Sequence, residues 1–193
     1  MRVAPAAFAD EAPFRLGCES AAITHGHPSG YLAAGFFAAV VRRCLKGHRL
    51  QTAIVRTCTE LKAQSRHREC LAAVERALDL AVDGAATPER VEALGGGWVA
   101  EEALAIALYC ALAARDFRDG VLRAVNHSGD SDSTGAMTGN LLGAMLGSDA
   151  IPAAWLEQLE LRDVIEQVGL DLFRHFGSQS RPALDDVKRY PPW

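Results

Sequence analysis

The chain has 193 residues, of which 49% are hydrophobic and 23% are charged. This balance is typical of a folded globular protein and excludes the low-hydrophobicity, high-charge composition of disordered chains. The formal net charge is −4 and the lysines and arginines are spread along the chain without a long basic run that could follow a phosphate backbone, so we expect no nucleic-acid partner.

Helical periodicity runs through nearly the whole chain. Ala, Leu, Glu and Arg dominate and runs of β-branched residues are almost absent, which indicates an all-α fold. We expect a single orthogonal multi-helical domain over residues 1–177, followed by an extended tail, 178–193, that carries three prolines. The predicted helices, in chain order, are residues 14–24, 29–45, 50–63, 69–82, 88–94, 100–113, 117–125, 133–146 and 161–176.

The cysteines and the apolar segments indicate the cellular environment. Five cysteines are an odd number, they are widely spaced, and no C-x-x-C pair occurs, so neither a disulfide framework nor a zinc cage is predicted. The most apolar later stretch, 136–146, is too short to span a bilayer and contains Asn140. We therefore expect a cytoplasmic protein without a membrane partner.

Oxygen ligands are concentrated in residues 126–135, here called the acidic loop. Asp130 and Asp132 stand there among hydroxyls and glycines, just before a predicted helix. Magnesium prefers carboxylate, hydroxyl and water oxygens, and the loop offers no soft ligand for zinc. A helix cap explains the loop taken alone equally well. The EF-hand pattern does not, because Leu141 stands at the twelfth position, where that pattern needs Glu.

The helix after the acidic loop carries a glycine every four residues. This spacing places the glycines on one face, at a cost of roughly 1 kcal/mol each relative to Ala. We expect a neighbouring helix to pack on this face, backbone to backbone, in preference to a ligand. The glycines are Gly135, Gly139, Gly143 and Gly147.

Two further segments have residues suited to binding a ligand. Residues 24–28 hold two histidines at a helix break, where His25 is the candidate for a phosphate or ribose contact and His27 is expected to be a packing residue. The three glycines at 95–97 allow a backbone to approach a ligand, and Trp98 could lie against an adenine or a sugar. A core position for Trp98 is equally consistent with the sequence.

Three segments, taken in order, resemble the ADP-ribosylglycohydrolase family, which includes the dinitrogenase-reductase-activating glycohydrolases and the vertebrate ADP-ribosylhydrolases. They are residues 2–5, residues 22–28, and residues 129–135 with the trailing 139–144. The last segment is highly specific, and the resemblance spans the chain to about Phe176.

The resemblance implies a magnesium-dependent hydrolase that acts on an ADP-ribosylated protein or an ADP-ribose derivative. Asp130, Asp132 and Ser133 would be ligands of a two-magnesium centre, with Thr134 as the alternative hydroxyl. His25 would contact the ribose or the diphosphate. The residues implied to line the ADP-ribose cleft are Gly97, Trp98, Asn126 and Gly129.

The chain departs from the family in one respect. The family's Thr-Asp-Asp run, which precedes the region where this chain begins and supplies the other metal ligands, does not occur in this sequence. We therefore expect a fold truncated at its N-terminus, whose acid/base carboxylate lies outside this sequence and which pairs with an N-terminal fragment or with a second copy. Three hypotheses stay open, namely an ADP-ribose hydrolase, a catalytically silent ADP-ribose or nucleotide reader, and a structural relative.

Overall fold

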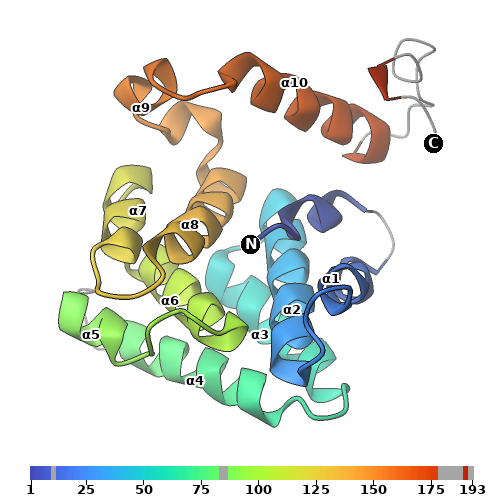
Figure 1. The fold of residues 1–193 in the computed structure, drawn as a ribbon, viewed down its shortest axis with the longest axis vertical. Helices are drawn as coiled ribbons and strands as arrows, with labels where there is room; N and C mark the ends of the chain where they lie inside the picture. The colour runs from blue at the N-terminus through green and yellow to red at the C-terminus, as the bar shows by residue number, and fades with distance from the viewer. Residues whose placement is uncertain (10–11, 83–86, 178–188, 191–193) are drawn as a thin grey trace.

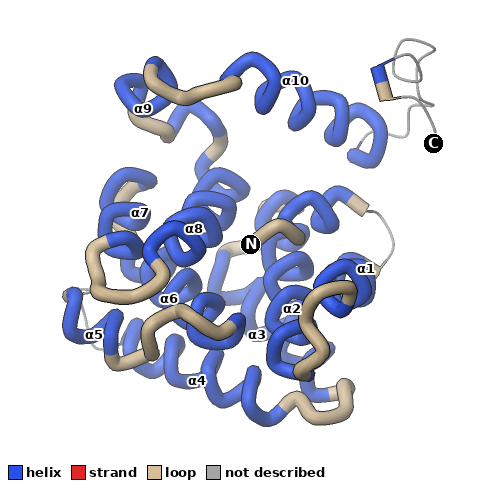
Figure 2. Tube along the Cα trace, in the orientation of Figure 1, coloured by secondary structure: helices blue, strands red, loops and turns tan. Residues whose placement is uncertain are grey.

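The computed structural model describes residues 1–9, 12–82, 87–177 and 189–190, and helices dominate these segments (Figure 1). No strand occurs among the described residues, which confirms the all-α class (Figure 2). None of the described helices has the length and apolarity needed to cross a membrane. The elements are η1 (Ala4–Phe8), α1 (Pro13–Ala22), α2 (Pro28–Leu45), α3 (Leu50–Lys62), α4 (Arg68–Val82), α5 (Pro88–Glu92), α6 (Ala100–Ala113), α7 (Phe117–Val125), α8 (Ser131–Leu146), η2 (Ser148–Ala150), α9 (Ala153–Glu157), α10 (Arg162–Leu172) and the π-helical turn η3 (Phe173–Gly177).

Two helices form the centre of the fold because they are apolar on nearly every side. Every residue of α6 from Ala103 to Ala111 is buried, and α2 buries most of its length, including Phe36 and Phe37. A helix that is apolar all round is stable only inside a core. Around this pair, α1 and α3 pack on α2, while α4, α7 and α8 pack on α6. The start of α8, which carries the acidic residues, is therefore held against the rigid centre.

The predicted helices agree with the observed ones to within a few residues, and two differences matter. The helix α8 begins at Ser131 and not at Ser133, so Asp132 lies in its first turn and not before it. The five-residue elements η1 and α9 were not predicted, whereas α5, of the same length, was.

The glycine face of α8 differs from the expectation of backbone-to-backbone packing. A Cβ at Gly135 would lie 2.5 Å from a methyl group of Val125, so the close neighbour there is a side chain of α7. At Gly139 the nearest atoms are at ordinary contact distance, and nothing lies within 4 Å at Gly143. The reason is the length of α7, whose first residue, Phe117, already faces Gly139. The close approach was therefore predicted correctly at one end of the row only.

The helix α10 lies apart from the other helices, as Figure 1 shows. Four apolar side chains along it are exposed, namely Val164, Ile165, Val168 and Leu170. At its C-terminal end, Asp171 accepts hydrogen bonds from Arg189 and Tyr190, which are the two described residues of the predicted tail. The rest of that tail lies outside the described residues.

Candidate functional site

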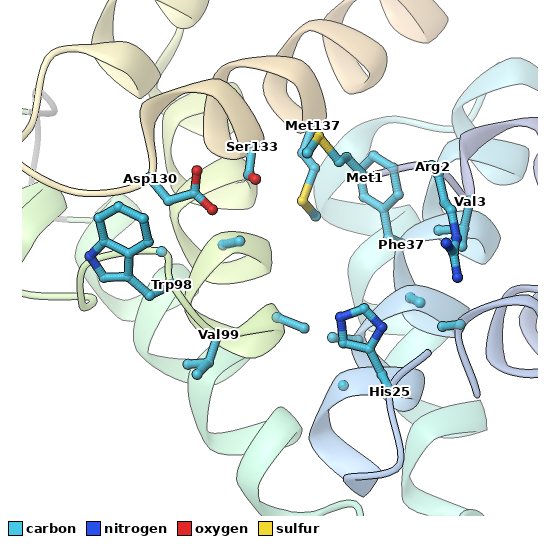
Figure 3. Close-up of a pocket in the computed structure, with 17 residues that line it drawn as sticks. Met1, Arg2, Val3, His25, Phe37, Trp98, Val99, Asp130, Ser133 and Met137 are labelled. Carbon is cyan, nitrogen blue, oxygen red and sulfur yellow. The ribbon is translucent and has the colours of Figure 1, made fainter. Parts of the chain in front are cut away.

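A cavity of about 330 Å³ lies where the N-terminus, the α1–α2 corner, the loop before α6 and the start of α8 meet. Figure 3 shows Asp130, Ser133 and Trp98 on one side of it, with His25 and Arg2 across from them. Its volume lies at the lower end of the range of small-molecule pockets. Its lining includes five of the eight predicted site residues, namely His25, Gly97, Trp98, Asp130 and Ser133.

The two carboxyl groups of the acidic loop lie close together. A hydrogen bond shared with the Asp132 carboxyl lowers the pKa of Asp130, and the hydroxyl and N–H of Ser133 lower it further, although burial opposes them. Two ionised carboxylates that lie close together repel each other unless a proton or a cation lies between them. With the Ser133 hydroxyl beside them, they form an all-oxygen donor set of the kind that magnesium prefers. These three residues therefore fit part of a magnesium site.

The alternative hydroxyl ligand, Thr134, points away from the cavity. It is fully buried, and its hydroxyl donates to the carbonyl oxygen of Ala124 at 2.6 Å. Its Oγ1 also lies 3.0 Å from Nε2 of His127. Because the Thr134 hydroxyl is already bonded inside the core, Ser133 is the better candidate for a metal ligand.

The helix-cap alternative explains only part of the acidic loop. Asp130 is the N-cap residue of α8, yet its side chain makes no capping hydrogen bond. The Asp132 carboxylate, by contrast, accepts the N–H of Ser133 at 2.9 Å, which satisfies one free donor at the start of the helix. Asp132 is exposed and is not part of the cavity lining. Helix capping therefore accounts for Asp132, whereas the carboxyl of Asp130, at the N-cap position, lines the cavity.

His25 is held in place by a short chain of hydrogen bonds. Arg2 donates to the Thr24 hydroxyl at 2.7 Å and to the Ser20 carbonyl at 3.2 Å. The Thr24 hydroxyl lies 2.8 Å from Nδ1 of His25, which leaves the other ring nitrogen for a ligand. No sequence pattern marked Arg2 as a cavity residue, because its position depends on how the N-terminus packs across α1.

The second histidine of the corner, His27, lies outside the cavity lining. Its Nδ1 contacts the Ser29 hydroxyl at 2.9 Å and lies 3.7 Å from the Glu69 carboxylate. These are local and surface contacts of an exposed side chain, so His27 is not the packing residue that the sequence analysis expected.

The glycine loop, residues 95–98, forms the cavity wall next to the acidic loop. Gly97 has a φ of +75°, a conformation that favours glycine, and the Trp98 side chain is 73% exposed, so it is not a core residue. Gly129 packs against the backbone of Gly96, outside the lining but in contact with this wall. Gly129, which was predicted to line the cleft, therefore contacts the cavity wall without lining the cavity itself.

Asn126 lies in a different place from the rest of the predicted set. It borders a separate hollow of about 130 Å³ with Pro88, Asp119, Leu122 and Arg123. Nor does the described part of the chain contain a cluster of three or more His, Cys, Asp or Glu side chains suited to a metal ion. The acidic loop thus supplies two carboxylates, fewer than a complete metal centre of acidic ligands would have.

Comparison with solved structures finds chains with the same fold. A chain described as an ADP-ribosylglycohydrolase-related protein complex superposes with a TM-score of 0.71 and 29% sequence identity. The match covers 89% of this chain and 56% of the other, so this chain spans little more than half of that neighbour.

Sequence relatives match over shorter segments. The ADP-ribosyl-[dinitrogen reductase] glycohydrolase of Rhodospirillum rubrum is 44% identical over 46 residues, which are 24% of this chain and 16% of the relative. ADP-ribosylarginine hydrolase Tri1 of Serratia proteamaculans is 33% identical over 85 residues, 44% of this chain and 23% of the relative. An uncharacterized protein of Archaeoglobus fulgidus is 36% identical over 83 residues, 43% and 27% of the two chains. The matched segments thus span about a quarter or less of these relatives.

The family model for ADP-ribosylglycohydrolases matches residues 1–182, nearly the whole length. Together with the shared helical fold, this match shows that the chain belongs to the ADP-ribosylglycohydrolase family.

Proposed function

We propose that this chain takes part in magnesium-dependent hydrolysis of the N- or O-glycosidic bond that joins ADP-ribose to a protein or a small molecule. The observation that carries the proposal is that Asp130 and Ser133 face the same cavity as His25 and Trp98. Oxygen ligands and groups suited to a ribose, a phosphate or an adenine thus line one space. The names of the relatives support a substrate with ADP-ribose on a protein side chain.

Each residue has a role in this proposal. Asp130, Asp132 and Ser133 would hold magnesium, which when bound polarises water and orients the ribose hydroxyls. His25, oriented by Thr24, would donate from its free ring nitrogen to a ribose or phosphate oxygen. As the glycosidic bond breaks, an oxocarbenium-like transition state develops at the anomeric carbon; water forms the new C–O bond there, and a proton ends on the departing nitrogen or oxygen.

Other residues would form the walls of the site. The exposed face of Trp98 would lie against the adenine or a sugar, and Gly97 would let the backbone approach the ligand. We further propose that the remaining metal ligands and the acid/base carboxylate come from outside this sequence, on a longer chain, an N-terminal fragment or a second copy. Hydrolysis by this chain alone is then expected to be weak. The reducing cytoplasm is its proposed location, because five free thiols suit that compartment.

The test is release of ADP-ribose from ADP-ribosylated arginine and serine peptides, with and without magnesium, by this chain and by a longer version carrying a Thr-Asp-Asp segment. We expect magnesium-dependent release by the longer version, and its loss in Asp130→Asn/Asp132→Asn. The matched control is Asp149→Asn, which changes an exposed carboxylate in η2 away from the cavity. If the longer version releases no ADP-ribose with magnesium, the hydrolase proposal fails.

A second candidate is a reader that binds ADP-ribose without cleaving it. The observation that favours it is the 73% exposure of Trp98 at the edge of a cavity that also contains His25. Calorimetry with ADP-ribose separates the two, since a reader gives binding heat without release of product. A structural relative would give neither, and Asp130→Asn/Asp132→Asn would then change only its stability.

A further inference from the structure

Glu102 makes a contact that its position in the helix does not explain. It is the third residue of α6, where a glutamate ordinarily reaches back to the N–H of its own N-cap residue. The N-cap of α6 is Val99, yet the Glu102 carboxylate accepts the N–H of Gly97 at 3.1 Å. The side chain thus extends two residues beyond the helix end and binds the glycine loop.

The glycine loop closes tightly around this carboxylate. Gly95 has a φ of +117°, and a Cβ there would lie 2.3 Å from Cδ of Glu102. No larger residue fits at Gly95 while Glu102 keeps this position. The loop conformation and the carboxylate position therefore depend on each other.

The same loop is bonded to the acidic loop by its backbone. The carbonyl oxygen of Gly96 accepts the N–H of Asp130 at 2.8 Å. Gly129 lies so close to Gly96 that a Cβ on it would stand 1.9 Å from that same oxygen. A movement of the glycine loop must therefore displace Asp130, whose carboxyl faces the cavity.

We propose that Glu102 is a positioning residue, whose carboxylate fixes the glycine loop and, through the hydrogen bond from Asp130 to Gly96, sets the place of Asp130 in the cavity. The side chain does not line the cavity and acts only through these two loops. These contacts do not depend on the proposed function, whereas their effect on the binding of magnesium and ADP-ribose rests on it.

Amide hydrogen exchange of the whole chain, followed residue by residue by NMR without any ligand, tests the coupling. In Glu102→Ala we expect the amides of Gly97 and Asp130 to exchange faster by about tenfold or more, the effect of losing a hydrogen bond to a charged group. Glu102→Gln keeps an oxygen acceptor without the charge and should give a smaller increase at both amides. Glu75→Gln, an exposed glutamate on α4, is the matched control, and the buried Ile54 amide is the internal reference.

The outcomes separate a positioning role from a general effect on stability. A uniform increase across all amides, Ile54 included, shows that Glu102 only stabilises the fold and overturns the proposal. Faster exchange at Gly97 with unchanged exchange at Asp130 overturns it as well, because the loops are then not coupled. If Glu102→Ala does not fold, the smaller graded effect of Glu102→Gln at the two amides decides.

Binding measurements then address the consequence. Calorimetry with magnesium chloride alone and with ADP-ribose should show weaker binding to Glu102→Gln than to Glu75→Gln, by several-fold. If even the longer version with a Thr-Asp-Asp segment binds neither probe, the proposed function fails, while the exchange data still test the role of Glu102. Equal binding by both variants, with binding by the unaltered chain intact, overturns the positioning role.

Discussion

Gly129→Ala tests the contact between the two loops directly. The added Cβ would stand 1.9 Å from the oxygen and 2.6 Å from the carbonyl carbon of Gly96, and both are backbone atoms that no side-chain rotation can move. The loops must then separate by about 1 Å, which also breaks the hydrogen bond from Asp130 to Gly96. Overpacking of this kind costs about 1–3 kcal/mol and the lost hydrogen bond about 1 kcal/mol more. We expect the free energy of unfolding to fall by about 2–4 kcal/mol.

Urea and thermal unfolding followed by circular dichroism measure this change. For a chain of this size, a loss of 3 kcal/mol lowers the melting temperature by about 6–12 °C. Gly143→Ala is the matched control, because nothing lies within 4 Å of its added Cβ and the helix propensity of alanine should raise stability by about 1 kcal/mol. If Gly129→Ala has the same melting temperature as the unaltered chain, the backbone contact between the two loops is refuted.

Three further predictions concern the buried polar groups. Hydrogen bonds from Arg115 and Arg123 hold the pKa of Asp119 below its usual range, so the stability it contributes is present above the unfolded pKa of about 4 and is lost as the pH falls. Asp119→Asn should therefore cost about 1–3 kcal/mol at pH 7 in urea unfolding, and an equal cost at pH 2 would contradict this. The Tyr109 hydroxyl is buried without a hydrogen-bond partner among the described residues, so Tyr109→Phe should leave stability unchanged or raise it by about 1 kcal/mol in thermal melts; a clear loss would reveal an unseen partner. Burial raises the pKa of the Cys70 thiol to about 12, so this thiol should resist Ellman's reagent at pH 8 until the protein is unfolded; rapid labelling of native protein would show that α4 opens.

The acidic loop shows how much of the site could be predicted from residue types. Carboxylates, a hydroxyl and glycines before a helix indicated an oxygen site, and the structure places Asp130 and Ser133 at a cavity. The choice between Ser133 and Thr134 could not be made from the sequence, since it depends on which hydroxyl turns into the core. The place of Asn126, in a separate hollow, likewise depends on the end of α7 and not on its neighbours in the sequence.

The amino-acid sequence by itself determined the all-α class, the approximate helix ends and the chemical character of the acidic loop. These properties arise from interactions between residues a few positions apart, which leave a periodic or compositional pattern. Only the tertiary structure decided that His25 and Asp130 face one cavity, that Trp98 is exposed, and that Glu102 binds Gly97. Such contacts follow from the packing of α2, α6 and α8 in three dimensions, and the spacing of residues along the chain does not show how these helices pack.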